Sequence, residues 1–278
     1  MWKPFHWALR GAGANFGVAT AFESRVHPIG PTDLGGMVVH PLARAREVLR
    51  FYREFAAGQP DELTMHAALL TSPDGILLNA MVCCSTGPVE TGETAVEPLR
   101  RCGPPVADLI GPMPDVAVQG IIGQGSPAGR LNYWKSTLMG EIPDDVIEAL
   151  VDYTRQAPSP QTAIVIVDTH GAYGRVAPDA TIYAHRDFPF DLVILSSWTD
   201  PADTERNISW TRGLYEAVRP HAPAGVYVNH LDGSEGQGRI RNTYGSNYGS
   251  NYARLSELKR MWDPTNFFRA NHNIKLAV

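Results

Sequence analysis

The chain has few cysteines, no long apolar run and no cluster of basic residues among its 278 amino acids. No stretch approaches the ~20 consecutive apolar residues that cross a membrane, and the N-terminus lacks the apolar core of a secretory signal. The three cysteines, Cys83, Cys84 and Cys102, are odd in number and two are adjacent, which favours a reducing compartment over a disulfide framework. We therefore expect a cytoplasmic protein without a membrane partner.

Charge and motif content exclude further classes of protein. The 29 acidic residues outnumber the 24 basic ones and give a net charge of −5, so nucleic acid is not an expected partner. The sequence has no P-loop and no cysteine–histidine set at the spacing of a metal site, so we expect no metal. A globular chain remains, 44% hydrophobic, with enough aromatic residues to line a site for a small-molecule substrate.

Strand-like alternation and helix-like apolar spacing follow one another along the chain. The expected strands are residues 18–26, a hairpin within 63–84, and residues 162–168, 180–186, 192–198 and 225–231. The expected helices are residues 42–58, 91–103, 143–156, 201–223 and about 251–261, and residues 104–129 are expected to be irregular. Consecutive hairpins with helices between them predict an α+β fold, a large antiparallel sheet covered by helices on one face.

A glycine-rich turn, Gly-Ala-Gly-Ala-Asn-Phe-Gly, occupies residues 11–17 and runs directly into the first expected strand. Such small side chains let a ligand or another segment of the chain approach the backbone closely. A dinucleotide-binding turn would follow a strand and precede a helix, and this one precedes a strand, which excludes that interpretation. From the residues alone, a structural loop and a binding loop both remain open.

Two further features each allow two interpretations. The tetrapeptide Tyr-Gly-Ser-Asn occurs twice within residues 244–252. The repeat is either a tandem duplication in a loop without function, or one of its Asn-Tyr pairs belongs to a site. Lys135 lies among aromatic residues, and it is either a pocket lysine or one whose stem is buried while its charge reaches solvent.

The two ends of the chain carry motifs of a known family. Residues 5–31 contain Trp-Ala-Leu-Arg-Gly followed by Asn-Phe-Gly-Val. The C-terminal part contains Tyr-x-Asn at 227–229, Asn-Tyr-x-Arg-Leu-x-x-Leu-Lys at 251–259 and Asp-Pro-x-Asn-x-Phe-Arg-x-Asn-x-Asn-Ile at 263–274. Over essentially its whole length the chain resembles the berberine-bridge-enzyme-like FAD-linked oxidoreductases, in their bacterial branch.

The resemblance implies a division of the chain. Residues 1–34 and 226–278 correspond to two pieces of the family's FAD-binding domain, and residues 35–225 correspond to its substrate domain. In the family, the loop that holds the FAD pyrophosphate precedes this region. We therefore expect a truncated, C-terminal portion, with a separate N-terminal FAD-binding chain as a candidate partner.

The resemblance also implies a site and an activity. It assigns these residues to FAD: Gly11, Gly13, Asn15, Gly17, Asn229, Asn251, Tyr252, Asn271 and Asn273. His230 follows the Tyr-x-Asn motif, where relatives place an aromatic side chain beside the flavin; it is the expected catalytic base, with Tyr227 as the other catalytic candidate. The implied activity is oxidation of a small organic substrate by hydride transfer to FAD. The alternative is a non-catalytic chain that binds a small ligand or a complementary subunit.

Overall fold

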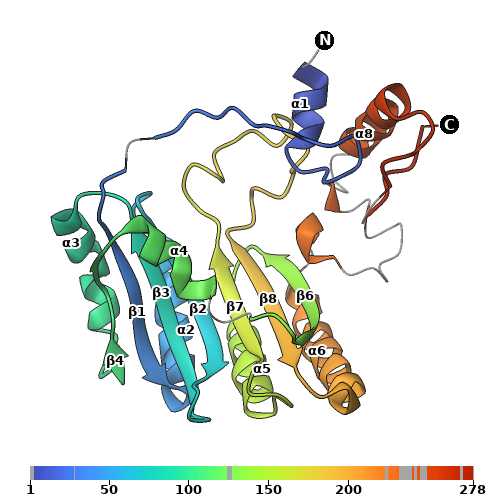
Figure 1. Ribbon diagram of the computed structural model, residues 1–278. Coiled ribbons are helices and arrows are strands. Elements are labelled where there is room, and N and C mark those ends of the chain that lie inside the picture. The colour runs from blue at the N-terminus through green and yellow to red at the C-terminus, as the bar shows by residue number, and fades with distance from the viewer. Residues whose placement is uncertain are drawn as a thin grey trace.

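The computed structural model describes residues 3–27, 29–123, 127–222, 225–231, 240, 243–244, 249–269 and 272–277. Its centre is an 8-stranded antiparallel sheet, as the sequence predicts (Figure 1). None of the helices in the described ranges combines the length and apolarity that a bilayer crossing needs.

Among the described strands, β2 pairs with β3 and β7 with β8, whereas the other pairs join strands that are not consecutive in the chain. They are β1 (Asp33–Pro41), β2 (Leu63–Thr71), β3 (Leu77–Ser85), β4 (Ala107–Asp108), β5 (Gly111–Met113), β6 (Leu131–Met139), β7 (Ala163–Asp168) and β8 (Phe190–Trp198). The strand order is β4-β1-β3-β2-β7-β8-β6, and β5 pairs with β1 off this path. The helices are α1 (Lys3–Leu9), α2 (Ala45–Ala56), α3 (Val89–Arg100), α4 (Asp115–Gly123), α5 (Asp144–Arg155), α6 (Thr204–Val218) and α8 (Gly249–Trp262). Short 3₁₀ turns are Leu42–Arg44, Pro201–Asp203, Arg219–His221 and η4 (Val228–His230).

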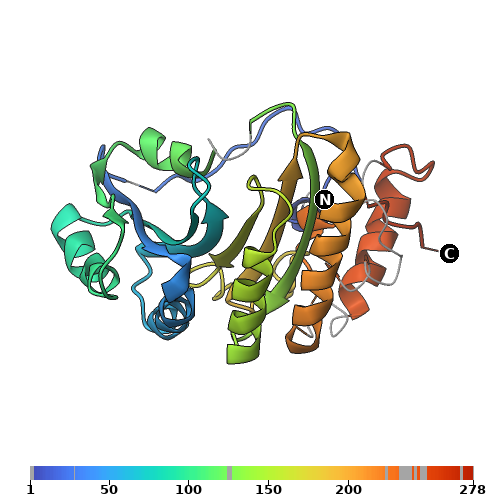
Figure 2. The ribbon, with the colours of Figure 1, turned by 90° about the horizontal axis from the view of Figure 1, so that it is seen from below.

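Helices α2, α5 and α6 cover one face of the sheet (Figure 2). Their apolar residues recur at helical spacing, so each helix buries one stripe, with Tyr52, Ile147 and Leu214 completely covered. Tyr52 fits this core because its hydroxyl group donates to the carbonyl groups of Met65 and Ile166, at 3.3 and 3.2 Å. On α6 the sequence predicts an inward Ala217, which is exposed, and Val218 is buried instead.

Helix α4 lies on the other side of the sheet (Figure 2). The expectation that residues 104–129 are irregular is therefore wrong for Asp115–Gly123 and for the short strands β4 and β5. The glycine and proline content hides this helix, because what holds it is a tertiary contact. Val118 packs against Gly35 so closely that a Cβ at that glycine would lie 2.9 Å from its side chain.

Three of the expected strands do not form in the described structure. Residues 18–26 are irregular, residues 180–186 are turns and coil, and η4 occupies the place of the strand at 225–231. Alternation predicts a strand only where a neighbouring strand supplies hydrogen bonds. Residues 18–26 have no such neighbour, and Val18, Phe22 and Val26 are 80%, 78% and 86% exposed.

A second, smaller hydrophobic core contains residues from both ends of the chain. We call the described residues within 3–17 and 225–277 the terminal region. Helices α1 and α8 lie side by side in it (Figure 1). Its buried apolar residues are Trp7, Ala8, Ala12, Phe16, Val228, Ile240, Tyr244, Leu255, Leu258 and Ile274, joined by Ile182 from the loop between β7 and β8. The predicted final helix and its inward residues Leu255, Leu258 and Trp262 are confirmed. The boundaries at 34/35 and 225/226 stay a prediction.

A completely buried lysine links the parts of the terminal region. Lys259 Nζ lies 2.5 Å from the carbonyl oxygen of Asn15 and 2.6 Å from Asp263 Oδ2, and it also donates to the carbonyl of Phe268. Asp263 accepts further hydrogen bonds from the backbone amides of Phe267 and Phe268, at 2.8 and 2.9 Å. Each buried charge is therefore paired, as stability requires.

Candidate active site

The glycine-rich turn is close to another segment at one end and open at the other. Gly11 and Gly13 have positive φ angles of +135° and +63°, which glycine adopts easily. A Cβ at Gly11 would lie 3.0 Å from the Ile182 side chain, so this glycine admits the loop between β7 and β8. A Cβ at Gly13 or Gly17 would have nothing within 4 Å. These two positions leave room for a ligand against the backbone.

Asn15 joins the turn to the C-terminal segment rather than facing open space. Its side-chain amide donates to the carbonyl groups of Ala12 and His272, at 2.8 and 3.2 Å, and accepts from the backbone amide of Ile274 at 3.0 Å. The resemblance assigns the turn and the C-terminal motif to one cofactor, and these hydrogen bonds place the turn beside His272 and Ile274 of that motif. Asn271 lies outside the described residues.

Two asparagines of the C-terminal motif carry buried polar atoms without a partner in the described part of the chain. They are Nδ2 of Asn251 and Oδ1 of Asn273, one donor and one acceptor. Buried polar groups are normally hydrogen-bonded. A flavin ring presents both acceptors and donors along its edge, so the Asn251 donor and the Asn273 acceptor fit that group. Tyr252 is engaged already, because its hydroxyl group accepts from the amide of Lys275 at 3.3 Å.

His230 lies over the end of β8, where it meets a buried carboxylate. Its Nδ1 is 3.1 Å from Oδ2 of Asp191 but does not form a hydrogen bond with it, and Oδ1 of Asp191 also has no hydrogen-bond partner among the described residues. The Tyr227 ring meets the His230 ring edge-on, with centroids 5.4 Å apart. Asn229 is turned aside, since its amide donates to the Tyr227 hydroxyl at 2.8 Å. Sequence reasoning missed Asp191, although a lone acid inside an apolar strand was a signal for it.

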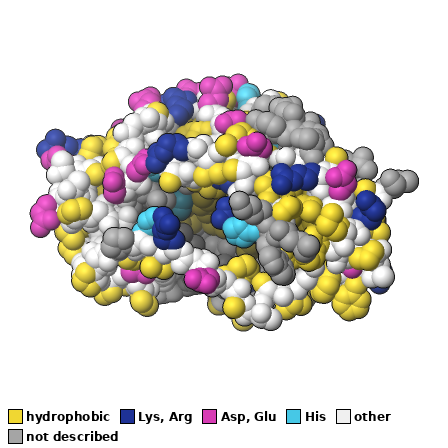
Figure 3. Space-filling model, turned by 90° about the horizontal axis from the view of Figure 1, so that it is seen from above, with side chains coloured by type: hydrophobic (Ala, Val, Ile, Leu, Met, Phe, Trp, Pro, Cys, Tyr) yellow, Lys and Arg dark blue, Asp and Glu magenta, His cyan; other side chains and the backbone are white. Residues whose placement is uncertain are grey.

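Aromatic rings from the loop between β7 and β8 extend this group. The ring of Tyr183 lies 5.7 Å from Tyr227 and 5.4 Å from Tyr173, and the Arg186 guanidinium lies 5.3 Å from the Tyr183 centroid. Burial, together with the hydrogen bond to Tyr173, raises the pKa of Tyr183, which keeps it a neutral phenol. Seen from above, the molecule is hollowed near its centre, where histidine and cationic side chains gather (Figure 3).

The strand register places Asp191 on the face of the sheet opposite α2, α5 and α6. One cross-strand row on that face consists of Met37, Val82, His66, Val167, Asp191 and Leu138. Two strand spacings separate His66 from Asp191, which is about 10 Å. His66 is neutral near pH 7, because burial lowers its pKa and its Nδ1 accepts from the Asp168 amide at 3.2 Å.

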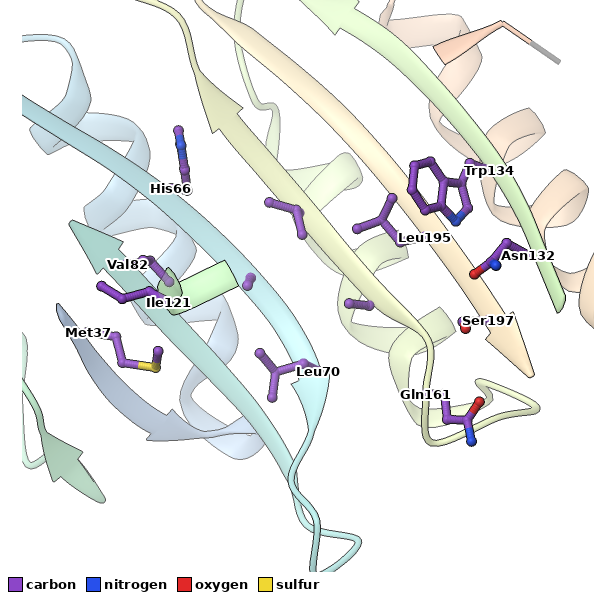
Figure 4. A pocket seen from close by; sticks show the side chains of 13 residues that line it. Met37, His66, Leu70, Val82, Ile121, Asn132, Trp134, Gln161, Leu195 and Ser197 are labelled. Carbon is purple, nitrogen blue, oxygen red and sulfur yellow. The ribbon is translucent and has the colours of Figure 1, made fainter. Parts of the chain in front are cut away.

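His66 also borders a cavity of about 200 Å³ on the same face (Figure 4). The lining residues are Met37, His66, Ala68, Leu70, Val82, Ile121, Asn132, Trp134, Gln161, Ala163, Val165, Leu195 and Ser197. Most are apolar, and Asn132, Gln161 and Ser197 gather at the far end from His66 (Figure 4). The site therefore combines an apolar pocket with a histidine–carboxylate pair beyond one of its ends.

Lys135 faces away from this pocket. It belongs to β6, is 9% exposed, and its ammonium group lies 5.6 Å from the centroid of Tyr215 on α6, in the helical layer. Its stem is buried, and it takes no part in the pocket lining.

Known proteins resemble the chain in sequence and in structure. A family model described as "Berberine and berberine like" matches residues 226–275. An FAD-linked oxidoreductase of Dictyostelium discoideum is 30% identical over 98% of this chain and 58% of its own length. A xylooligosaccharide oxidase of Thermothelomyces thermophilus is 24% identical over 94% of this chain and 56% of its own. The structure of berberine bridge enzyme from Eschscholzia californica superimposes with a TM-score of 0.83, at 19% identity, over 99% of this chain and 61% of that one.

The fold of the chain and its matches along the sequence are those of the berberine-bridge-enzyme-like FAD-linked oxidoreductases, as the terminal motifs predict. The chain spans about 58% of the length of the first curated relatives.

Proposed function

We propose that this chain supplies the substrate-binding sheet and the flavin-ring side of an FAD-dependent oxidoreductase that oxidises a small organic substrate. The observation that carries the proposal is the convergence of an open glycine turn with unpaired asparagine amides, next to a histidine–carboxylate pair. The relatives named above are oxidoreductases, which does not favour the alternative of a non-catalytic chain.

FAD, when bound, supplies the acceptor for a hydride. The backbone at Gly13 and Gly17 would lie against it, and the amides of Asn251 and Asn273 would bond its edge. These contacts orient the ring and need no movement of the turn, because Gly13 already has the φ angle that admits a close ligand.

His230 is the proposed base. A hydrogen bond from Nδ1 of His230 to the Asp191 carboxylate, whose Oδ2 lies 3.1 Å away, would hold the proton on Nδ1 and leave Nε2 to accept. Nε2 would then accept the hydroxyl proton of a substrate whose hydride the bound FAD would accept. Tyr227 accepts from Asn229, so its own hydroxyl proton is available to the substrate oxygen.

Flavin binding to the purified chain tests the proposal. FAD and lumiflavin, which is the ring alone, are titrated separately, and quenching of flavin fluorescence is measured. Gly17→Val should weaken both at least about tenfold, because the side chain fills the open space and not a protein contact. Gly58→Val is the matched control, since that glycine also has open space around it and lies far from the turn in sequence. Quenching that is equal in the two variants would contradict the site.

A separate FAD-binding chain is the proposed partner. The exposed side chains of Val18, Phe22 and Val26 alternate like a strand that lacks its neighbour, and a partner strand would cover them. Hydrogen exchange at residues 18–27 should be fast in the chain alone and slow when the FAD-binding chain is added. Slow exchange in the isolated chain would contradict this pairing.

A further inference from the structure

The cavity on the uncovered face is long, because it crosses several rows of the sheet. From one end to the other the lining rows contain Asn132 and Ser197, then Trp134, Leu195 and Ala163, then Val165 and Ala68, and finally His66, whose row continues through Val167 to Asp191 outside the lining. Ser197 and Asp191 are six residues apart on β8, which corresponds to about 20 Å along a strand.

The lining has polar groups at its ends and no charged side chain in the middle. Among the described residues that border the cavity, none is Asp, Glu, Lys or Arg. Gln161 Oε1 is buried at the far end without a hydrogen-bond partner in the described chain. Asn132 is already engaged, because its amide donates to the carbonyl of Arg130 at 3.1 Å. At this end of the cavity, Gln161 Oε1 can therefore accept a hydrogen bond from a ligand.

We infer that the substrate is an elongated, uncharged molecule with a flat apolar body, an oxidisable group at the His66–Asp191 end and a hydroxyl group that donates to Gln161. A flat body suits a floor of small apolar side chains bounded by Trp134 on β6 and Ile121 on α4 (Figure 4). A charged group in the middle of the cavity would lose its hydration without a charged partner among the described lining residues, which disfavours a charged body. The inference rests on the proposed function for the oxidation, but the recognition itself depends only on the sheet.

Binding is measured on the purified full chain without flavin, so the test does not depend on turnover. The probe is dihydroxystilbene, a flat neutral molecule with a hydroxyl group at each end, followed by quenching of tryptophan fluorescence. Unsubstituted stilbene should bind about tenfold more weakly, because the Gln161 acceptor stays unpaired. Stilbene dicarboxylate should bind at least about 100-fold more weakly than dihydroxystilbene. Equal or tighter binding of the dicarboxylate would overturn the inference, and so would preferential binding of xylotriose.

Two substitutions separate recognition at the end from occupation of the middle. Gln161→Leu should reduce the affinity for dihydroxystilbene about tenfold and leave that for stilbene unchanged. Ala163→Leu should weaken both probes, since it fills the floor. Gln156→Leu is the control, because this exposed residue directly follows α5 on the opposite face of the sheet, and circular dichroism confirms folding. An unchanged affinity in Gln161→Leu overturns the inference, while intact flavin binding in the same preparation leaves the proposed function standing.

Discussion

The sheet region (residues 33–218) and the terminal region differ in how far local sequence patterns predict them. In the sheet region each covering helix buries a stripe that its own spacing predicts, although among the described strands only β2·β3 and β7·β8 pair strands that are consecutive in the chain. In the terminal region, Asn15 bonds to Ile274 across 259 positions and to Lys259 across 244. Local patterns therefore predict the helices and strands of the first region, whereas long-range polar contacts hold the second region together.

The largest expected effect joins the two regions. His230 belongs to the terminal region and Asp191 to the sheet, so their pairing should be essential in the assembled enzyme. We expect His230→Phe to lower turnover about 100- to 10,000-fold in the FAD-loaded, reconstituted enzyme, with folding unchanged. The control is His221→Phe, in a 3₁₀ turn after α6. Turnover within about threefold of wild type would remove His230 as the base and make Tyr227 the next candidate.

Removing the buried lysine should break the terminal region selectively. Lys259→Met leaves the Asp263 carboxylate buried without its cation, and the melting temperature of that region should fall by on the order of 10 °C. Hydrogen exchange should accelerate in α1 and α8 and stay slow in β2 and β7. Lys275→Met, at an exposed position, is the control. Uniform acceleration across the sheet would show that the regions unfold together.

Gly36 tests a long-range backbone contact within the sheet region, between β1 and the segment before β5. Gly36 has a φ of +136°, and a Cβ there would lie 2.2 Å from the carbonyl oxygen of Leu109, which is backbone and cannot yield. Gly36→Ala should therefore lower the free energy of unfolding by about 2–4 kcal/mol in urea titrations. Gly111→Ala, with open space around it, should change it little. A neutral Gly36→Ala would mean that the 104–113 segment packs more loosely than the distances indicate.

A fall in pH should destabilise the sheet region before the terminal region, and this is the smallest of the four effects expected here. Burial lowers the pKa of His40 and His66, both in the sheet region. The unfolded chain then binds more protons below about pH 6.5, so stability falls as pH decreases from there. Burial raises the pKa of Asp168 above 3.8. Between 3.8 and this raised pKa, protonation of Asp168 stabilises the folded chain and partly offsets the loss caused by the histidines.

The terminal region should resist acid longer. Burial alone would raise the pKa of Asp263, but Lys259 and two backbone amides outweigh it and lower the pKa from 3.8. Its contribution is complete above 3.8 and is lost as pH falls through the lowered value. Hydrogen exchange at pH 7 and pH 5 should therefore show β2 loosening before α8. His66→Gln should reduce the pH dependence in β2, whereas the exposed His6→Gln should not.

The sequence predicts the sheet region well because its signals are short-range. Val48, Tyr52, Ile147 and Leu150 follow helical spacing, and all four are buried as expected. The three wrong strands lie outside the regular sheet, at 18–26, 180–186 and 225–231, where alternation exists without a strand to pair with.

For the candidate site, the resemblance of the terminal motifs predicts some of the residues but not their neighbours from the sheet. It singled out His230 and the open glycines, but a motif does not show which side chains a distant strand will place opposite them. Asp191 enters only through the register of β8, and Gln161 only through the turn before β7, which borders the cavity. The role of Asn15 as a tie between segments likewise depends on contacts more than 250 positions away.

The long separation between the two halves of the terminal region bears on synthesis of the chain. Trp7 and Phe16 are almost completely buried, yet their partners Leu255 and Ile274 are synthesised about 250 residues later. At 5–20 residues per second, these apolar side chains wait roughly 10 to 50 s for their neighbours. During that interval the sheet can form and hold residues 33 and 218 in place, which shortens the loop that must then close. Trp7 and Phe16 therefore stay without their core partners while the sheet folds.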